Sequence, residues 1–149
     1  VKDFHPKDYP ADEPMVPHGM SVALTAPEAF RFTFEASPER HVRAAQLLAP
    51  NAGLPTEPAE FLPMVLADLM RDIDIPNGVA AVGFGENDIP DLVDGTMKQQ
   101  RLLATAPRDV TEGGAPVSLD TPGPDAHGIV RTRTGWRRLL PRGPGGGGS

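Results

Sequence analysis

Apolar residues in the first part of the chain recur at the spacing of an α-helix. The first series begins just after His18 and consists of Val22, Ala26, Phe30 and Phe34. Residues four positions apart lie on one side of a helix, so this series predicts an amphipathic helix with one inward face. Within it, Thr25-Ala26-Pro27-Glu28 has the form of a capping box with proline in the first turn. This motif predicts a break near Thr25 and a second helix that ends at about Ala36.

A further helix is predicted to start at Ser37-Pro38-Glu39. Serine is a favoured N-cap, proline is tolerated at the first helical position, and an acidic residue suits the positive end of the helix dipole. The inward side of this helix would carry Val42, Ala45, Leu48 and Ala49. Prolines 50, 55 and 58 then indicate a loop from Pro50 to Pro58.

The clearest helical stripe of the chain follows this loop. It consists of Phe61, Leu62, Val65, Leu66, Leu69, Met70 and Ile73. Pro63 must lie in the first turn of this helix or kink it, because proline lacks the amide hydrogen that an interior position donates. Asp68 and Asp72 fall on the polar side of the stripe, so we expect both to be solvated.

The next segment begins with a turn at Ile75-Pro76-Asn77-Gly78, and residues 79–82 are either extended or irregular. Asn87 or Asp88 is expected to cap another helix, with Pro90 near its start. Its apolar face is Ile89, Leu92, Val93 and Met97, and Pro107 ends the helical run that follows. No segment has the pattern of a sheet strand, so the predicted fold class is an all-α helical bundle.

The amino-acid composition of the chain excludes several classes of function. The chain has 149 residues, no cysteine and a net charge of −6. These values indicate one domain at most, exclude disulfide and thiolate chemistry, and argue against nucleic acid as a partner. No apolar run is long enough for a membrane span, and no signal-peptide pattern is present. The first residue is not methionine, so we expect the chain to be a piece of a longer protein.

The composition changes abruptly at Gly113. Residues 113–149 hold ten Gly, five Pro and five Arg but only two acidic residues, Asp120 and Asp125. Such a segment buries too little apolar surface to offset its ordering entropy, so we expect disorder after about Glu112. A basic tail also suits nucleic acid or an acidic membrane, but simple disorder is the favoured interpretation. The last five residues, Gly145 to Ser149, have the composition of a linker.

His18 is the candidate functional residue. It follows a proline-rich loop and precedes the first apolar helix, and imidazole is the commonest side-chain ligand of transition metals. One histidine does not hold a metal, and on chemistry alone a plain helix-start role is the commoner one. We expect His5 to be solvated in a charged loop and His41 to lie on a helix surface, and we assign no role to His127.

Several segments together resemble the iron-containing (group III) alcohol dehydrogenases. They are Pro17-His18-Gly19, Asp88-Ile89-Pro90-Asp91-Leu92-Val93, Pro38-Glu39-Arg40-His41 and Gly78-Val79-Ala80-Ala81-Val82-Gly83. The resemblance covers residues 1–112 and is greatest to the hydroxyacid-oxoacid transhydrogenases of that family. It implies the C-terminal, all-helical domain of such an enzyme. His18 matches the last of the three histidines that, with an aspartate, hold the family's metal ion.

The other ligands and the glycine-rich dinucleotide site belong to family segments that precede Val1. The resemblance therefore implies no cofactor-binding residue in this chain and leaves its catalytic residues unknown. The implied partners are the missing N-terminal nucleotide-binding domain and a small hydroxy-acid, oxo-acid or alcohol substrate, within a possible homo-oligomer. The implied location is the cytoplasm in a bacterium and the mitochondrion in a eukaryote.

The implied reaction is metal-dependent hydride transfer with iron or zinc and NAD. In the transhydrogenases, 4-hydroxybutyrate and 2-oxoglutarate become succinate semialdehyde and 2-hydroxyglutarate, and the isolated chain is expected to be inactive. The change at Gly113, where the family continues with another helix, resembles a shifted reading frame. Two alternatives stay open, namely an alcohol dehydrogenase of other substrate range and a non-catalytic helical interaction module.

Overall fold

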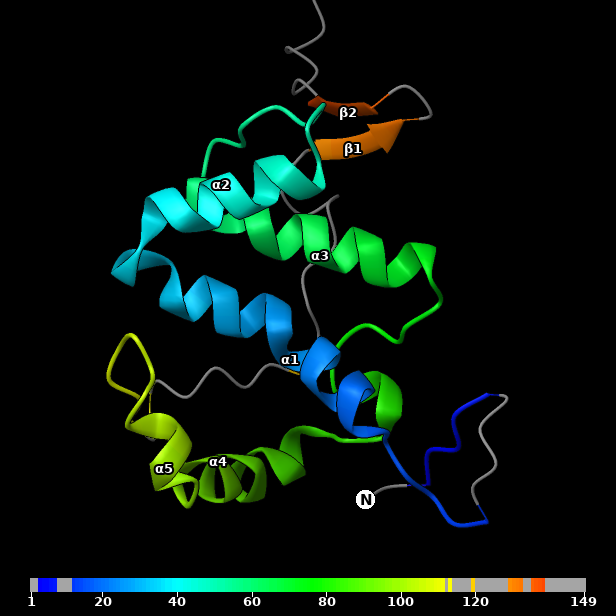
Figure 1. The fold of residues 1–149 in the computed structure, drawn as a ribbon. Coiled ribbons are helices and arrows are strands. Elements are labelled where there is room, and N and C mark those ends of the chain that lie inside the picture. The colour runs from blue at the N-terminus through cyan, green and yellow to red at the C-terminus, as the bar shows by residue number, and fades with distance from the viewer. Residues whose placement is uncertain are drawn as a thin grey trace, which may run out of the picture.

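The computed structural model describes residues 3–7, 12–111, 113, 119, 129–132 and 135–138. Five α-helices lie in the described part of the chain (Figure 1). They are α1 (His18–Thr33), α2 (Pro38–Leu48), α3 (Phe61–Asp72), α4 (Ile89–Met97) and α5 (Gln100–Leu103). The all-α fold predicted from the sequence is confirmed for the segment from His18 to Leu103.

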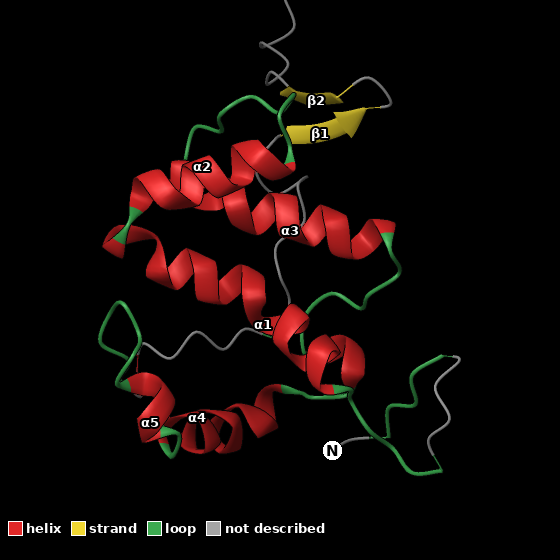
Figure 2. Cartoon of the chain, viewed as in Figure 1, coloured by secondary structure: helices red, strands yellow, loops and turns green. Residues whose placement is uncertain are grey.

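Helix α3 is the centre of the domain, because α1 and α2 both pack against it (Figure 2). Between α2 and α3 lies a cluster of buried residues made of Ala45, Phe61, Leu62 and Val65. A second cluster joins α1, α3 and the following connection through Leu24, Met70 and Val82. Pro63 lies in the first turn of α3, as predicted, and is fully buried.

Helix α1 is continuous, so the predicted break near Thr25 is wrong. The hydroxyl of Thr25 lies 3.3 Å from the carbonyl oxygens of both Ser21 and Val22, where it bonds back along the helix instead of capping a new one. Pro27 lies inside α1 and is one of the most deeply buried side chains. Burial of its ring helps to offset the backbone hydrogen bond that proline cannot donate.

The predicted inward face of α1 is also wrong. Its buried residues are Leu24 and Pro27, whereas Val22 is 54% exposed and Phe30 is 40% exposed. Helix α3 contacts the side of α1 that carries Leu24, and the more regular apolar series faces away from it. Both sides of α1 are therefore apolar.

Helices α2 and α3 begin where the sequence predicts, and most of their predicted inward positions are buried or half-buried, including Ala45, Phe61 and Val65. Ser37 precedes Pro38 at the start of α2, although its side chain makes no capping hydrogen bond. The exposed positions include three that were expected to face inward, namely Leu48, Leu69 and Ile73. Asp68 is 2% exposed instead of solvated, because α1 and α2 cover two sides of α3. It forms an ion pair with Arg71, while Asp72 is exposed as expected.

The connection from α3 to α4 is irregular. Residues 79–82, which were predicted to be either extended or irregular, are therefore not a strand. A short 3-10 turn covers Ala80–Val82, and another covers Glu86–Asp88. Asp88 rather than Asn87 is the N-cap residue of α4, although its side chain makes no capping hydrogen bond to that helix. Its carboxylate instead accepts a hydrogen bond of 2.8 Å from the amide of Gly85, at the start of the preceding 3-10 turn. The predicted face of α4 is half-buried, and α5 ends before Pro107 as expected.

A short hairpin lies in the segment that was expected to be disordered. Strand β1 (Ile129–Thr132) pairs antiparallel with β2 (Gly135–Arg138), and Arg131 is opposite Trp136. These strands were not predicted from the sequence, although their β-branched and aromatic residues favour extended backbone. A two-stranded hairpin is marginally stable by itself. His127 and the glycines at 145–148 lie outside the described residues.

Candidate functional site

His18 is the first residue of α1, and its side chain is exposed. Pro17 precedes it in an extended conformation, and the carbonyl oxygen of Pro17 accepts a hydrogen bond of 2.9 Å from the amide of Ser21. The hydroxyl of Ser21 donates to the carbonyl oxygen of His18 over 2.8 Å. These backbone contacts fix the first turn while the imidazole stays available. The space beside it is open, because a Cβ atom at Gly19 would meet nothing within 4 Å.

The segment that leads into His18 is anchored to the core. Phe4 and Val16 pack against the cluster of Leu24, Met70 and Val82. The amide of Met15 donates a hydrogen bond of 2.9 Å to the carbonyl oxygen of Phe4, which ties the two ends of this loop together. The start of α1 is therefore held in place by packing on both sides of His18.

The described residues do not complete a metal site. Within them, no group of three or more His, Cys, Asp or Glu side chains could hold a metal ion. His5 is exposed, as expected, and lies in the preceding segment. An exposed imidazole on a fixed helix end suits a borderline divalent metal as one ligand. His18 is thus chemically suited to act as one ligand, and the described residues bring no second and third ligand to it.

His41 was expected to lie on a helix surface, but it is half-buried and packed between helices. Its Nδ1 atom lies 2.8 Å from the carbonyl oxygen of Ser37, and its Nε2 atom lies 3.2 Å from the hydroxyl of Thr33. The rings of Phe30 and Phe34 contact it edge-on. The short 3-10 turn Phe34–Ala36 folds the end of α1 over the first turn of α2, which produces these contacts. Both ring nitrogens are engaged, so His41 serves the fold.

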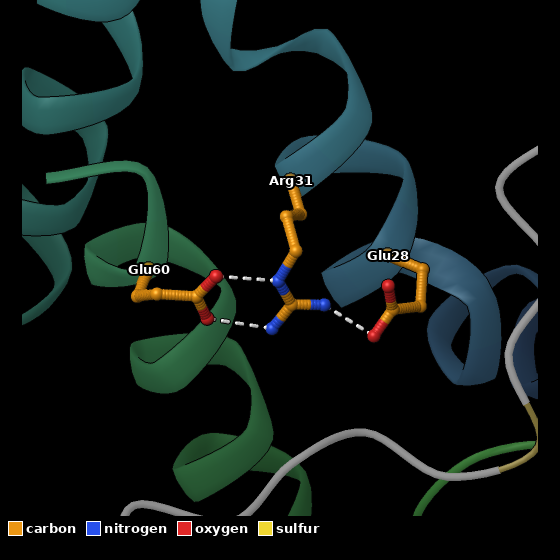
Figure 3. A network of polar contacts seen from close by, with 3 residues as sticks. All are labelled: Glu28, Arg31 and Glu60. Atoms are coloured by element: carbon orange, nitrogen blue, oxygen red, sulfur yellow. Dashed lines mark hydrogen bonds and ion pairs between the residues drawn. The ribbon is translucent and has the colours of Figure 1, made fainter. Parts of the chain in front are cut away.

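An ionic network that the sequence analysis missed joins α1 to the start of α3 (Figure 3). The Nε and Nη2 atoms of Arg31 donate to the two carboxylate oxygens of Glu60 over 2.6 and 2.7 Å, and Nη1 bonds to Glu28. The hydrogen bonds with Glu60 raise the pKa of Arg31 above its ordinary value, although burial opposes this. The spacing of Glu28 and Arg31 suggests their pairing, but no local signal points to Glu60.

Arg108 fastens the segment after α5 to the end of α1. Its Nη1 atom lies 3.1 Å from the carbonyl oxygen of Phe32 and 3.2 Å from the carboxylate of Glu35. Its guanidinium also lies 4.9 Å from the centre of the Phe32 ring, which is the distance of a cation–π contact. Both arginines join segments that are far apart in the sequence, so we interpret both contacts as structural. No helix in the described ranges is long and apolar enough to cross a membrane.

The region of this chain that matches known proteins includes all five α-helices of its described part. Residues 13–114 match the profile described as the Fe-containing alcohol dehydrogenase family, C-terminal. The hydroxyacid-oxoacid transhydrogenase, mitochondrial, of Pongo abelii is 45% identical over 116 residues, which are 75% of this chain and 24% of that protein. The human protein of the same name is 45% identical over 111 residues, 72% of this chain and 23% of its own length.

A more distant relative is the probable hydroxyacid-oxoacid transhydrogenase, mitochondrial, of Dictyostelium discoideum. It is 36% identical over 114 residues, which are 74% of this chain and 21% of that protein. The chain thus spans about a quarter of the length of the curated relatives it matches. No solved structure matches it. The predicted division after Glu112 lies close to the end of the matched region at residue 114 and stays a prediction.

Proposed function

This chain belongs to the Fe-containing alcohol dehydrogenase family, and we propose that it supplies one metal ligand, His18, to a hydride-transferring oxidoreductase. The identity of 45% to proteins named hydroxyacid-oxoacid transhydrogenase carries this proposal, because the matched residues include the helix that begins at His18. The substrates proposed by this similarity are 4-hydroxybutyrate and 2-oxoglutarate. Since the chain spans a quarter of those relatives, the activity belongs to the longer subunit.

Two features of the chain suit this chemistry. His18 presents an imidazole at a fixed position, and imidazole is a ligand that suits first-row divalent metals. The amino-terminal end of α1 carries a partial positive charge from the helix dipole and favours the approach of a carboxylate substrate. When bound, iron or zinc supplies Lewis-acid polarisation of a substrate oxygen. NAD is proposed to bind to the part of the subunit that lies outside this chain.

The names of the relatives also suggest the cellular compartment of this protein. The relatives carry the word mitochondrial in their names, so we propose a mitochondrial location if the source is a eukaryote and a cytoplasmic one if it is a bacterium. One alternative is an alcohol dehydrogenase with another substrate range. A second is a non-catalytic helical module, which is favoured by the lack of a ligand cluster within the described residues.

The test uses a full-length subunit made by joining this chain, in place of the matched segment, to the rest of the human relative. With bound metal and NAD, this subunit is expected to transfer hydride from 4-hydroxybutyrate to 2-oxoglutarate, and the isolated chain is expected to be inactive. If the joined subunit oxidises simple alcohols instead, the first alternative replaces the proposal. If the joined subunit does not fold, the ligand role can be tested in the intact human relative. The substitution there is His→Ala at the position that aligns with His18.

A further inference from the structure

The first turn of α1, which carries His18, lacks a side-chain cap. Pro17 is the N-cap residue, and its ring cannot form the capping hydrogen bond that a serine or an aspartate would form. Gly19, the second residue of α1, weakens the turn further, because glycine loses the most conformational freedom on folding. The position of the imidazole therefore depends on how the chain is held just before His18.

Phe4 supplies such a support from an earlier part of the chain. It is half-buried and packs against the core cluster that joins α1, α3 and the connection that follows. Pro6 is buried as well, while His5 between them is exposed, so this segment turns its apolar side toward the core. The cluster includes Leu24 of α1 itself, so Phe4 is anchored to the helix that His18 begins.

The backbone connects this anchor to His18. The amide of Met15 donates a hydrogen bond of 2.9 Å to the carbonyl oxygen of Phe4. Val16, the next residue, packs against the same cluster as Phe4. Pro17 then has a φ of −55°, and its ring keeps φ near this value. With these restraints in place, little rotational freedom remains between the core and His18.

We propose that Phe4 is a positioning residue for His18 and thereby raises the affinity of the subunit for its metal ion. This inference rests on the proposed ligand role of His18. Metal–ligand bonds are about 2 Å long, and a ligand must be held within about 0.5 Å of its productive position. Loss of the Phe4 ring would release the preceding segment from the core, so the imidazole would spend less time at that position.

The experiment compares Phe4→Ala with Phe84→Ala in the joined full-length subunit. Phe84 is the matched control, because it is also half-buried and packs against the same cluster, but it follows α3 instead of leading into His18. Both variants are expected to lower the melting temperature, since both remove a ring that packs against the core. Only Phe4→Ala is expected to raise the dissociation constant for Zn²⁺, by about 10-fold.

Three further measurements separate positioning from a general loss of stability. Phe4→Leu keeps an apolar anchor and is expected to restore most of the Zn²⁺ affinity. An excess of Zn²⁺ is expected to restore kcat/KM in Phe4→Ala, because the ligand is displaced but not removed. In the isolated chain, Phe4→Ala is expected to speed hydrogen exchange of the Ser21 amide, whose bond to Pro17 closes the first turn. Phe84→Ala is expected to leave that exchange rate unchanged.

Two results for the joined subunit would overturn the inference. One is an equal loss of Zn²⁺ affinity in Phe4→Ala and Phe84→Ala, which would make the effect one of core stability. The other is an unchanged dissociation constant for Zn²⁺ in Phe4→Ala. If Phe4→Ala prevents the joined subunit from folding, the exchange of the Ser21 amide in the isolated chain decides. Equal exchange rates in the parent chain and the variant would then refute the role of Phe4.

His18→Ala separates this inference from the proposed function. If this variant binds Zn²⁺ as tightly as the parent subunit, the ligand role itself fails, and the inference fails with it. If His18→Ala loses Zn²⁺ while Phe4→Ala keeps it, the ligand role stands and only the positioning role of Phe4 fails.

Discussion

Arg31 of α1 and Glu60, which directly precedes α3, form a two-point ion pair with hydrogen bonds of 2.6 and 2.7 Å. The side chains are 24% and 15% exposed, so water screens the pair only in part. Two parallel hydrogen bonds fix the orientation of both groups, which a single contact would not do. This pair therefore sets how α1, and with it His18, lies against α3.

Arg31→Met is expected to lower the free energy of unfolding of the isolated chain by about 2 kcal/mol. The substitution keeps much of the apolar stem but leaves the carboxylates of Glu28 and Glu60 without their guanidinium partner. The measurement is urea denaturation followed by circular dichroism. Lys98→Met is the control, because it breaks an ion pair with Asp94 in which the side chains are 71% and 62% exposed. Similar shifts of the urea midpoint in both variants would contradict the structural role of Arg31.

His41→Ala is expected to lower the free energy of unfolding by about 2 kcal/mol, because it removes a hydrogen bond to Ser37 and two edge-on ring contacts. His5→Ala, at an exposed position, is the matched control and should leave the urea midpoint where it is. A His41→Ala variant as stable as the parent chain would show that these contacts add nothing to the fold.

The starts of α2, α3 and α4 could be predicted because their signals are local. Pro38, Pro63 and Pro90 each lie in the first turn of a helix, where proline is tolerated, and the structure has all three there. The break at Thr25 could not be excluded from the sequence, since the position of Pro27 depends on burial against a distant part of the chain. Local patterns identify where helices begin better than which side they bury.

The errors at Asp68 and His41 have a common physical cause. Both residues look solvated when only their own helix is considered, and both are covered by a second helix or a turn that the sequence does not place. The pairing of Arg31 with Glu60 spans 29 positions and has the same origin. The ligand role of His18 came from family resemblance alone, because a single histidine at a helix start has no distinctive spacing.

Asp74→Gly is expected to stabilise the isolated chain by about 0.5 kcal/mol. Asp74 has a φ of 56° just after α3, where the amide of Ile75 donates to the carbonyl oxygen of Met70 over 2.9 Å. Glycine adopts this left-handed conformation without the steric cost that a side chain adds, and it commonly ends helices in this way. Asp74→Ala keeps that cost, so its melting temperature should not rise. A gain with alanine equal to that with glycine would show that backbone strain is not the cause.

The proposed function depends on His18 being a metal ligand, and the metal content of the joined full-length subunit is the sharpest test of that role. We compare His18→Ala with His5→Ala by measuring metal per subunit together with kcat/KM. Loss of a group that merely supports a ligand lowers metal affinity by about 10–100-fold. Loss of the ligand itself is therefore expected to empty the site and abolish activity, while His5→Ala keeps both. A His18→Ala subunit that retains its full metal content would contradict the account.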